Sequence, residues 1–144
     1  MNFQDFMDEG KVYKTVKDEQ KIIALIKNSS SFLASLNNIK VDSTNASMQL
    51  AVHYDALRMI IEAIALKEEY NIYSHEAFSA FMEYVLKDQN SAREFDNFRK
   101  TRNKINYYGK QIEQDEAKIK LNQIRVLIER LKLRHLSEFL QKDL

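Results

Sequence analysis

The chain of 144 residues contains no proline and only two glycines. The tight turns of β-sheets depend on these two residue types, because glycine reaches positive φ angles at low cost and proline presets a turn. Few β-sheet proteins of this length form without glycine and proline. Composition therefore predicts an all-α fold, and the chain is long enough for one domain, residues 1–144, to bury a core of its own.

Charge and cysteine content exclude several classes of protein. The net charge is only +1, so any affinity for nucleic acid must come from a local patch of cations. The absence of cysteine excludes a disulfide scaffold and thiol catalysis, and it is consistent with the reducing cytoplasm. The apolar runs are far shorter than the roughly 18 residues of a membrane span, and the first residues do not form a signal peptide. We expect a soluble cytoplasmic protein with no membrane contact.

Apolar residues recur at helical spacing in five segments. These segments are residues 11–36, 44–69, 75–86, 91–109 and 115 onwards. The segment 44–69 carries two apolar stripes, so we expect it to be the most buried helix. We expect residues 1–10 to fray, although Phe3 and Phe6 are able to dock on a neighbour, and residues 28–31 to bend or break the first helix. The expected architecture is an up-and-down bundle of about five helices with no sheet.

The segment 91–110 combines an apolar stripe with a basic flank. Ser91 and Glu94 have the spacing of a capping box, and Gly109 is placed to end the helix in the left-handed conformation. Five lysines or arginines and no acid occur between residues 97 and 110. Arg102 lies at the border of a predicted buried stripe. The members of that stripe are Phe95, Phe98, Ile105, Tyr108 and Ile112.

The basic flank of this helix is suited to binding phosphate. Its residues are Arg99, Arg102, Asn103, Asn106 and Lys110. Arginine holds phosphate through its N–H groups, amides bind bases or sugars, and Tyr107 and Tyr108 are able to stack on bases. The alternative is a solvated basic face that complements the helix dipole. Arg58 and Glu62, four residues apart, form either an ordinary surface pair or part of the same cleft as Arg102.

Neither a metal site nor a cofactor site is expected. His53, His75 and His135 lie far apart in the sequence, and no zinc-ligand spacing is present. The chain has no glycine-rich phosphate loop and no nucleophile elbow. These absences argue against a nucleotide-hydrolysing or acyl-transfer enzyme.

Residues 102–109 resemble the signature of the HEPN domain family (higher eukaryote and prokaryote nucleotide-binding). Residues 54–58 and 72–78 also resemble the second and third helices of its small prokaryotic members, and the likeness extends over about residues 48–131. The resemblance implies an up-and-down helical bundle that forms a homodimer through its motif helices. It also implies an RNA or nucleotide ligand and, as in many members, a metal-independent ribonuclease toxin paired with a minimal nucleotidyltransferase antitoxin.

The chain departs from the family pattern at one position. Arg102 and Asn103 match the motif, but Tyr107 stands where active members have a histidine that assists attack of the ribose 2′-hydroxyl. An unperturbed tyrosine, with a pKa near about 10, is a poor base at neutral pH. We therefore expect a dimeric module that binds RNA or a nucleotide, or docks a nucleotidyltransferase, with a degenerate ribonuclease motif. Two alternatives stay open: a ribonuclease toxin that uses Arg102 with Asn106, Tyr107 or Tyr108, and a helical interaction protein without a ligand.

Overall fold

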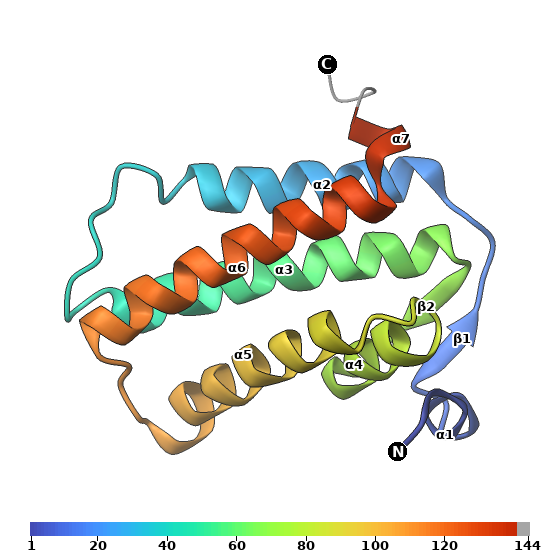
Figure 1. The fold of residues 1–144 in the computed structure, drawn as a ribbon, viewed down its shortest axis with the longest axis horizontal. Coiled ribbons are helices and arrows are strands. Elements are labelled where there is room, and N and C mark those ends of the chain that lie inside the picture. The colour runs from blue at the N-terminus through green and yellow to red at the C-terminus, as the bar shows by residue number, and fades with distance from the viewer. Residues whose placement is uncertain (141–144) are drawn as a thin grey trace.

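The computed structural model describes residues 1–140, which form seven helices and two short strands (Figure 1). The helices are α1 (Phe3–Asp8), α2 (Glu19–Ala34), α3 (Ala46–Lys67), α4 (His75–Tyr84), α5 (Gln89–Tyr108), α6 (Gln114–His135) and α7 (Ser137–Leu140). The strands are β1 (Val12–Lys14) and β2 (Tyr70–Ile72). The prediction of a mostly helical bundle is confirmed, and α2 to α6 correspond to the five predicted helices. None of the helices within residues 1–140 combines the length and the apolar character that a membrane span needs.

The two strands pair antiparallel, so the prediction that the fold has no sheet is wrong. Val12 lies opposite Ile72, and both side chains are buried in the core. The first long helix therefore begins at Glu19 rather than near residue 11, with the carboxylate of Asp18 accepting from the Lys21 amide over 3.1 Å. Strands of three residues are too short to show a two-residue period, which is why the sequence pattern did not predict them.

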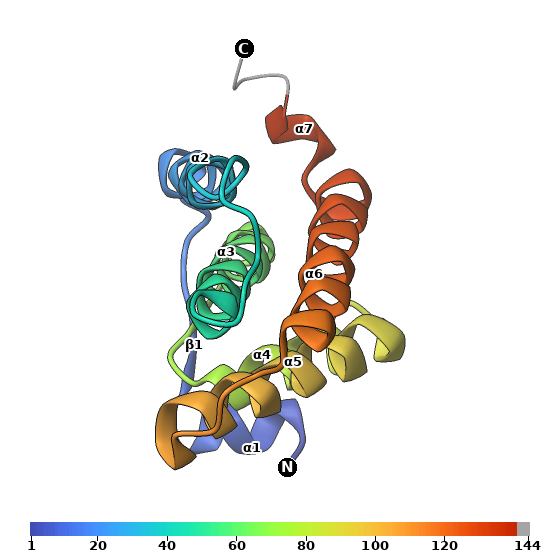
Figure 2. The ribbon, with the colours of Figure 1, turned by 90° about the vertical axis from the view of Figure 1, so that its left-hand side faces the viewer.

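Helix α3 is the central element of the bundle. Viewed along the bundle, α2 and α6 lie on different sides of α3, and α4 and α5 pass beneath it (Figure 2). Thirteen of its residues are buried, more than in any other helix within residues 1–140. The prediction that this helix is the most buried is confirmed. The hydroxyl of Ser29 donates to the buried carbonyl of Ala56 over 2.8 Å, so α2 continues unbroken through residues 28–31.

Helix α1 is ordered rather than frayed. Asn2 and Asp5 form a capping box, in which each side chain accepts from the other residue's amide over 2.9 Å. Phe3 and Phe6 are buried, and the ring of Phe3 packs edge-on against Tyr70 at 5.0 Å. The expected fraying of residues 1–10 is therefore not seen, because two phenylalanines fasten this segment to the core.

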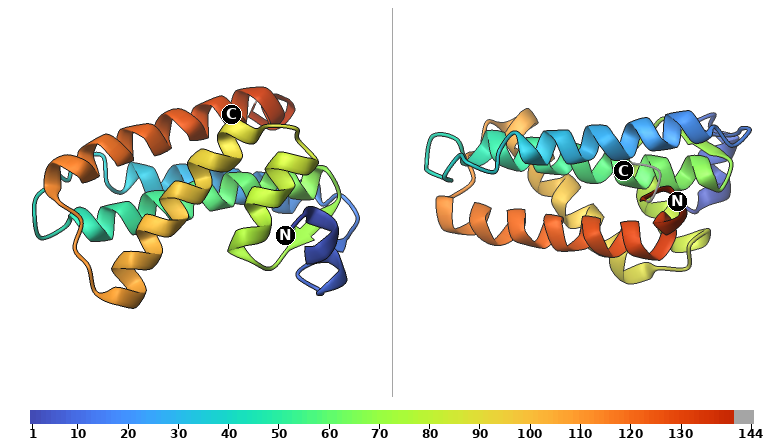
Figure 3. Two further views of the ribbon diagram at one scale, coloured as in Figure 1. Left: turned by 60° about the horizontal axis from the view of Figure 1, so that its bottom comes forward. Right: turned by 90° about the horizontal axis from the view of Figure 1, so that it is seen from above.

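The capping residue of helix α5 lies three residues before the expected one, Ser91. Asp88 is the capping residue and accepts from the Ser91 amide over 3.0 Å, whereas Ser91 and Glu94 both accept from Arg130 of α6. The capping box predicted at Ser91 is therefore wrong. Gly109 does end the helix, with a φ of 64° in the left-handed region. The helix runs obliquely across the bundle and its C-terminal end projects outward (Figure 3).

Candidate functional site

Arg102 is the starting point of the candidate site, because it is a half-buried cation without an acidic partner. Its guanidinium carbon lies 5.4 Å from the centroid of the Tyr54 ring. Within residues 1–140 its side chain makes no hydrogen bond and no ion pair. The other half-buried arginines are all hydrogen-bonded. They are Arg58, Arg99, Arg125 and Arg130. The aromatic ring stabilises the charge of Arg102 by a cation–π contact, and the N–H groups of the guanidinium are not sealed from solvent and have no protein partner within residues 1–140.

Tyr54 connects Arg102 to a histidine on another helix. Its side chain is fully buried on α3, where its ring also lies 5.4 Å from that of Phe95. Its hydroxyl is hydrogen-bonded to Nδ1 of His75 over 2.6 Å, and the two rings are nearly parallel, at 11°. Burial raises the pKa of Tyr54 well above its ordinary value, so the hydroxyl keeps its proton at neutral pH.

His75 is the first residue of α4, and it is half-buried. Its Nε2 atom has no hydrogen-bond partner within residues 1–140, and it is not among the atoms sealed from solvent. Burial lowers the pKa of His75, and repulsion from Arg102 and Arg58 lowers it further, whereas Asp55 acts in the opposite direction. The imidazole is therefore neutral at neutral pH.

Arg58 acts on the same two side chains as Arg102. Its Nη1 atom lies 2.8 Å from Oε2 of Glu62, one helical turn along α3, and both side chains are half-buried. The charge of Arg58 acts on both Tyr54 and His75. We call the group Tyr54, Arg58, His75 and Arg102 the Arg102 site.

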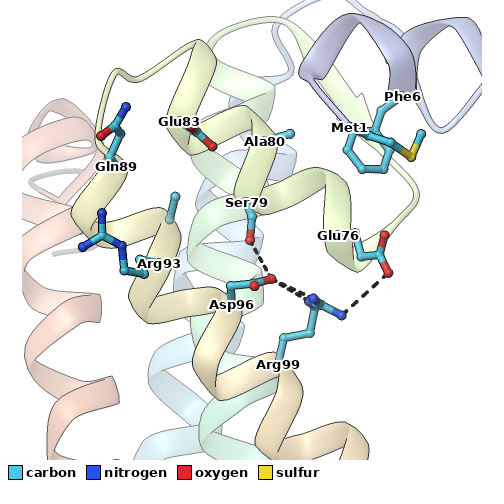
Figure 4. A pocket seen from close by; sticks show the side chains of 11 residues that line it. Met1, Phe6, Glu76, Ser79, Ala80, Glu83, Gln89, Arg93, Asp96 and Arg99 are labelled. Carbon is cyan, nitrogen blue, oxygen red and sulfur yellow. Dashed lines mark hydrogen bonds and ion pairs between the residues drawn. The ribbon is translucent and has the colours of Figure 1, made fainter.

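Arg99 takes part in a separate network of hydrogen bonds and ion pairs (Figure 4). Its Nε and Nη2 atoms donate to Oδ1 of Asp96 over 3.0 and 2.7 Å, and its Nη1 lies 3.8 Å from Glu76. Ser79 of α4 donates to the same Asp96 oxygen over 3.4 Å. Burial raises the pKa of Asp96, but the hydrogen bonds and charge of Arg99 outweigh it and hold that pKa below its ordinary value.

This network lines a pocket of about 430 Å³ between α1, α4 and α5, which Glu83 and Arg93 also line. The Arg99 guanidinium is directed at Asp96 and Glu76, so its N–H groups are taken up by these carboxylates and fasten α5 to α4. Its charge also acts on Tyr54 and His75.

The remaining predicted site residues lie further along α5. Asn103 is half-buried, whereas four others are exposed, namely Asn106, Tyr107, Tyr108 and Lys110. Tyr108 is 75 % exposed, so its predicted place in the buried stripe is wrong, while Ile112 is buried as predicted. No side-chain hydrogen bond joins these residues to the Arg102 site in the described part of the chain. Tyr107 follows Arg102 by five residues, about 140° around the helix, and therefore faces another side.

Sequence reasoning missed Tyr54 and His75 as members of the site. The three histidines were considered only as zinc ligands, and no group of three or more His, Asp or Glu side chains within residues 1–140 could hold a metal ion. The available sequence signal is Ser74, a residue type that caps helices, which correctly indicates that His75 begins a helix. The contact with Tyr54 spans 21 residues and depends on tertiary packing.

Comparisons of the chain with protein-family models, with curated proteins and with solved structures give no match. The functional interpretation therefore depends on the chemistry of the Arg102 site and on the sequence resemblance described above.

Proposed function

We propose that this chain is a HEPN-like module that binds RNA or a nucleotide through the Arg102 site. The observation that supports this proposal is the half-buried guanidinium of Arg102, which lies over an aromatic ring and has no acidic partner within residues 1–140. The guanidinium N–H groups of Arg102 have no protein partner within residues 1–140 and are not sealed from solvent, so they are available to an anionic ligand. Arginine is also the residue that matches the oxygens of a phosphate with two parallel N–H groups.

The neighbours of Arg102 are chemically consistent with a nucleotide ligand. Arg58 contributes a second positive charge, although it is shared with Glu62. The carboxylates of Asp55 and Glu62 are acceptors for ribose hydroxyl groups, and they also weaken the attraction for a highly charged polyanion. This balance favours one or two phosphate contacts over a long electrostatic track.

The proposed module binds without efficient cleavage. General acid–base catalysis contributes about 10²–10⁴-fold to such reactions, and the motif position that would supply it carries Tyr107 rather than histidine. The biological setting that we propose is a toxin–antitoxin-type system with a nucleotidyltransferase partner.

The proposed working form is a homodimer that uses the projecting end of α5. Tyr107 and Tyr108 are 72 % and 75 % exposed there, beside the partly buried Ile105. Two neighbouring tyrosines at a helix end supply the amphipathic contact area that interfaces use. A second copy of the chain would pack the same end of its own α5 against this one across a twofold axis.

Fluorescence anisotropy with a labelled single-stranded RNA, over a salt series, tests the binding proposal. Arg102→Ala should weaken binding about tenfold or more, because it removes a charge-assisted phosphate contact. Arg93→Ala is the matched control, since Arg93 is an exposed arginine of the same helix, and Lys120→Ala is a second control on α6. Equal losses in all three variants would show nonspecific charge attraction, and no binding by the wild-type protein would contradict the proposal.

A further inference from the structure

We propose that His75 is a phosphate-binding residue, whose Nε2–H donates to the same phosphate group that Arg102 holds, and that Tyr54 fixes the proton on that nitrogen. The inference rests on the proposed function, since it requires a phosphate at the Arg102 site. It adds a binding residue from a different helix, and it specifies which atom carries the hydrogen.

The proton position follows from the burial of Tyr54. Its side chain is fully buried, and the hydrogen of its hydroxyl needs an acceptor. Nδ1 of His75, at 2.6 Å, is the partner of that hydroxyl within residues 1–140. If Nδ1 carried the hydrogen instead, the hydroxyl would accept from it and its own hydrogen would be left without an acceptor. The hydroxyl therefore donates to Nδ1, and the neutral imidazole carries its hydrogen on Nε2.

The surroundings of Nε2 distinguish His75 from the other two histidines. His53 uses both ring nitrogens, with Nδ1 2.8 Å from the Gln49 carbonyl and Nε2 accepting from Arg125 over 3.0 Å. His135 has its Nε2 sealed from solvent, with no hydrogen-bond partner within residues 1–140. The Nε2 atom of His75 is open to solvent and unpaired within the described residues, so its hydrogen is available to a ligand.

Tyr54 also places His75 beside the arginines. The Tyr54 side chain has the Arg102 guanidinium over its ring and His75 at its hydroxyl, so one rigid, buried side chain supports both groups. A guanidinium and an imidazole N–H held by one aromatic side chain are two donors from which the oxygens of a phosphate can accept. The fully buried ring has little freedom to move, so the donor set is preorganised before the ligand arrives.

The phosphate-binding form of His75 should be the neutral imidazole. The charged groups that act on it are Asp55 and Arg58 of α3, Arg99 and Arg102 of α5, and the exposed Glu76 lies next to it on α4. Burial and the three arginines disfavour the imidazolium. A second hydrogen, on Nδ1, would also leave the hydroxyl hydrogen of Tyr54 without an acceptor, so the site should bind phosphate without taking up a proton.

The same proton position argues against a catalytic role for His75. A neutral imidazole with its hydrogen on Nε2 has no lone pair there to accept the proton of a ribose hydroxyl. His75 is thus a donor to the phosphate rather than a general base, which agrees with a module that binds RNA and cleaves it poorly.

The test measures anisotropy of a 3′-labelled single-stranded RNA, with and without a 5′-phosphate, from pH 5.5 to 8.5. Wild-type affinity for the RNA without a 5′-phosphate should change little between pH 8.5 and 6.5, because the neutral imidazole is the donor throughout this range. His75→Asn should weaken binding at pH 7.5, whereas His135→Asn should leave it unchanged. A large advantage of the 5′-phosphorylated RNA identifies a terminal phosphate as the ligand, and equal binding of both identifies an internal phosphodiester.

Nitrogen-detected NMR of the wild-type protein supplies a measurement that does not depend on a variant folding. We expect the His75 ring to carry its hydrogen on Nε2, and its signals to shift when RNA is added. A hydrogen on Nδ1, or binding at pH 7.5 that is not weakened in His75→Asn, would overturn this inference while leaving the proposed function intact. RNA cleavage that is lost in His75→Asn would overturn it too, since His75 would then act on a proton. If the protein does not bind RNA at any pH, the proposed function itself is contradicted.

Discussion

Arg125 of α6 donates a hydrogen bond from Nε to Nε2 of His53 on α3, over 3.0 Å, across the middle of the bundle. The other ring nitrogen of His53 lies 2.8 Å from the carbonyl of Gln49, so the ring is neutral and both of its nitrogens are used. Arg125 also donates to the Leu33 carbonyl at the end of α2 over 3.3 Å. The bonds of Arg125 thus connect α2, α3 and α6. The bond to His53 forms only while that histidine is unprotonated.

Stability should therefore fall in mild acid. Burial, chiefly, lowers the pKa of His53 from 6.5 to about 4. Because the folded state resists protonation, this contribution is fully present above pH 6.5 and is lost as the pH falls through about 4. The loss is at most about 3 kcal/mol in the free energy of unfolding. Urea unfolding at pH 7.5 and 5.0 measures it; His53→Asn should flatten the dependence, and an unchanged dependence in that variant would assign it to other groups.

Ser29→Ala should destabilise the fold through a single buried hydrogen bond. Ser29 is 1 % exposed and donates to the Ala56 carbonyl, which fastens α2 to α3. Loss of one such bond costs about 1 kcal/mol. Ser30→Ala is the matched control, because Ser30 is exposed on the same helix and should change little. Thermal unfolding of both variants tests the prediction, and equal shifts would mean that helix propensity rather than this bond is measured.

Arg99 and Arg102 lie one turn apart on α5, and their substitution should have different effects. Arg99 is bound to Asp96, so Arg99→Ala should lower the free energy of unfolding by about 1–2 kcal/mol, since it leaves a half-buried carboxylate less well paired. Arg102→Ala should leave stability almost unchanged and reduce RNA binding. Urea unfolding and RNA anisotropy on both variants separate the two roles. An Arg99→Ala variant that keeps its stability but loses RNA binding would indicate that Arg99 binds the ligand.

The extent to which the sequence predicts this molecule depends on how local each signal is. The double stripe of α3, the glycine end of α5 at Gly109 and the border position of Arg102 follow from spacing within one helix, and the structure agrees with each. The β1–β2 pair and the start of α5 at Asp88 depend on contacts between distant segments. The same holds for the candidate site.

Helical periodicity predicted Arg102 as a candidate ligand residue, but it carries no information on which side chain from another helix will lie beside it. Tyr54 appeared in the sequence as one more apolar position of a stripe. His75 appeared as an isolated histidine. Only the packing of α3 against α4 and α5 joins them.

The proposed homodimer should depend on the exposed tyrosines at the projecting end of α5. Tyr108→Glu should shift the chain toward the monomer, because the charge would have to be desolvated in an interface. Tyr84→Glu is the control, since Tyr84 is also an exposed tyrosine but lies on α4. Sedimentation velocity at tens to hundreds of micromolar measures the change. A wild-type monomer at high micromolar concentration would contradict the proposed dimer, and a dimer in both variants would move the interface away from α5.

The purified protein should bind RNA but cleave it slowly or not at all, and Tyr107→His should raise the cleavage rate. Arg102 is able to orient a phosphate, but position 107 offers no group that titrates near neutral pH, and a correctly placed acid–base group contributes about 10²–10⁴-fold. Tyr107 is exposed, so the substitution should not disturb the core. Tyr108→His is the matched control, because it adds the same imidazole one position away, about 100° around the helix. Cleavage is followed with an RNA labelled at one end, in the absence of metal ions. Rapid cleavage by the wild-type protein that is abolished by both Arg102→Ala and Tyr107→Phe would contradict this expectation, and it would make the tyrosine hydroxyl a participant in the reaction.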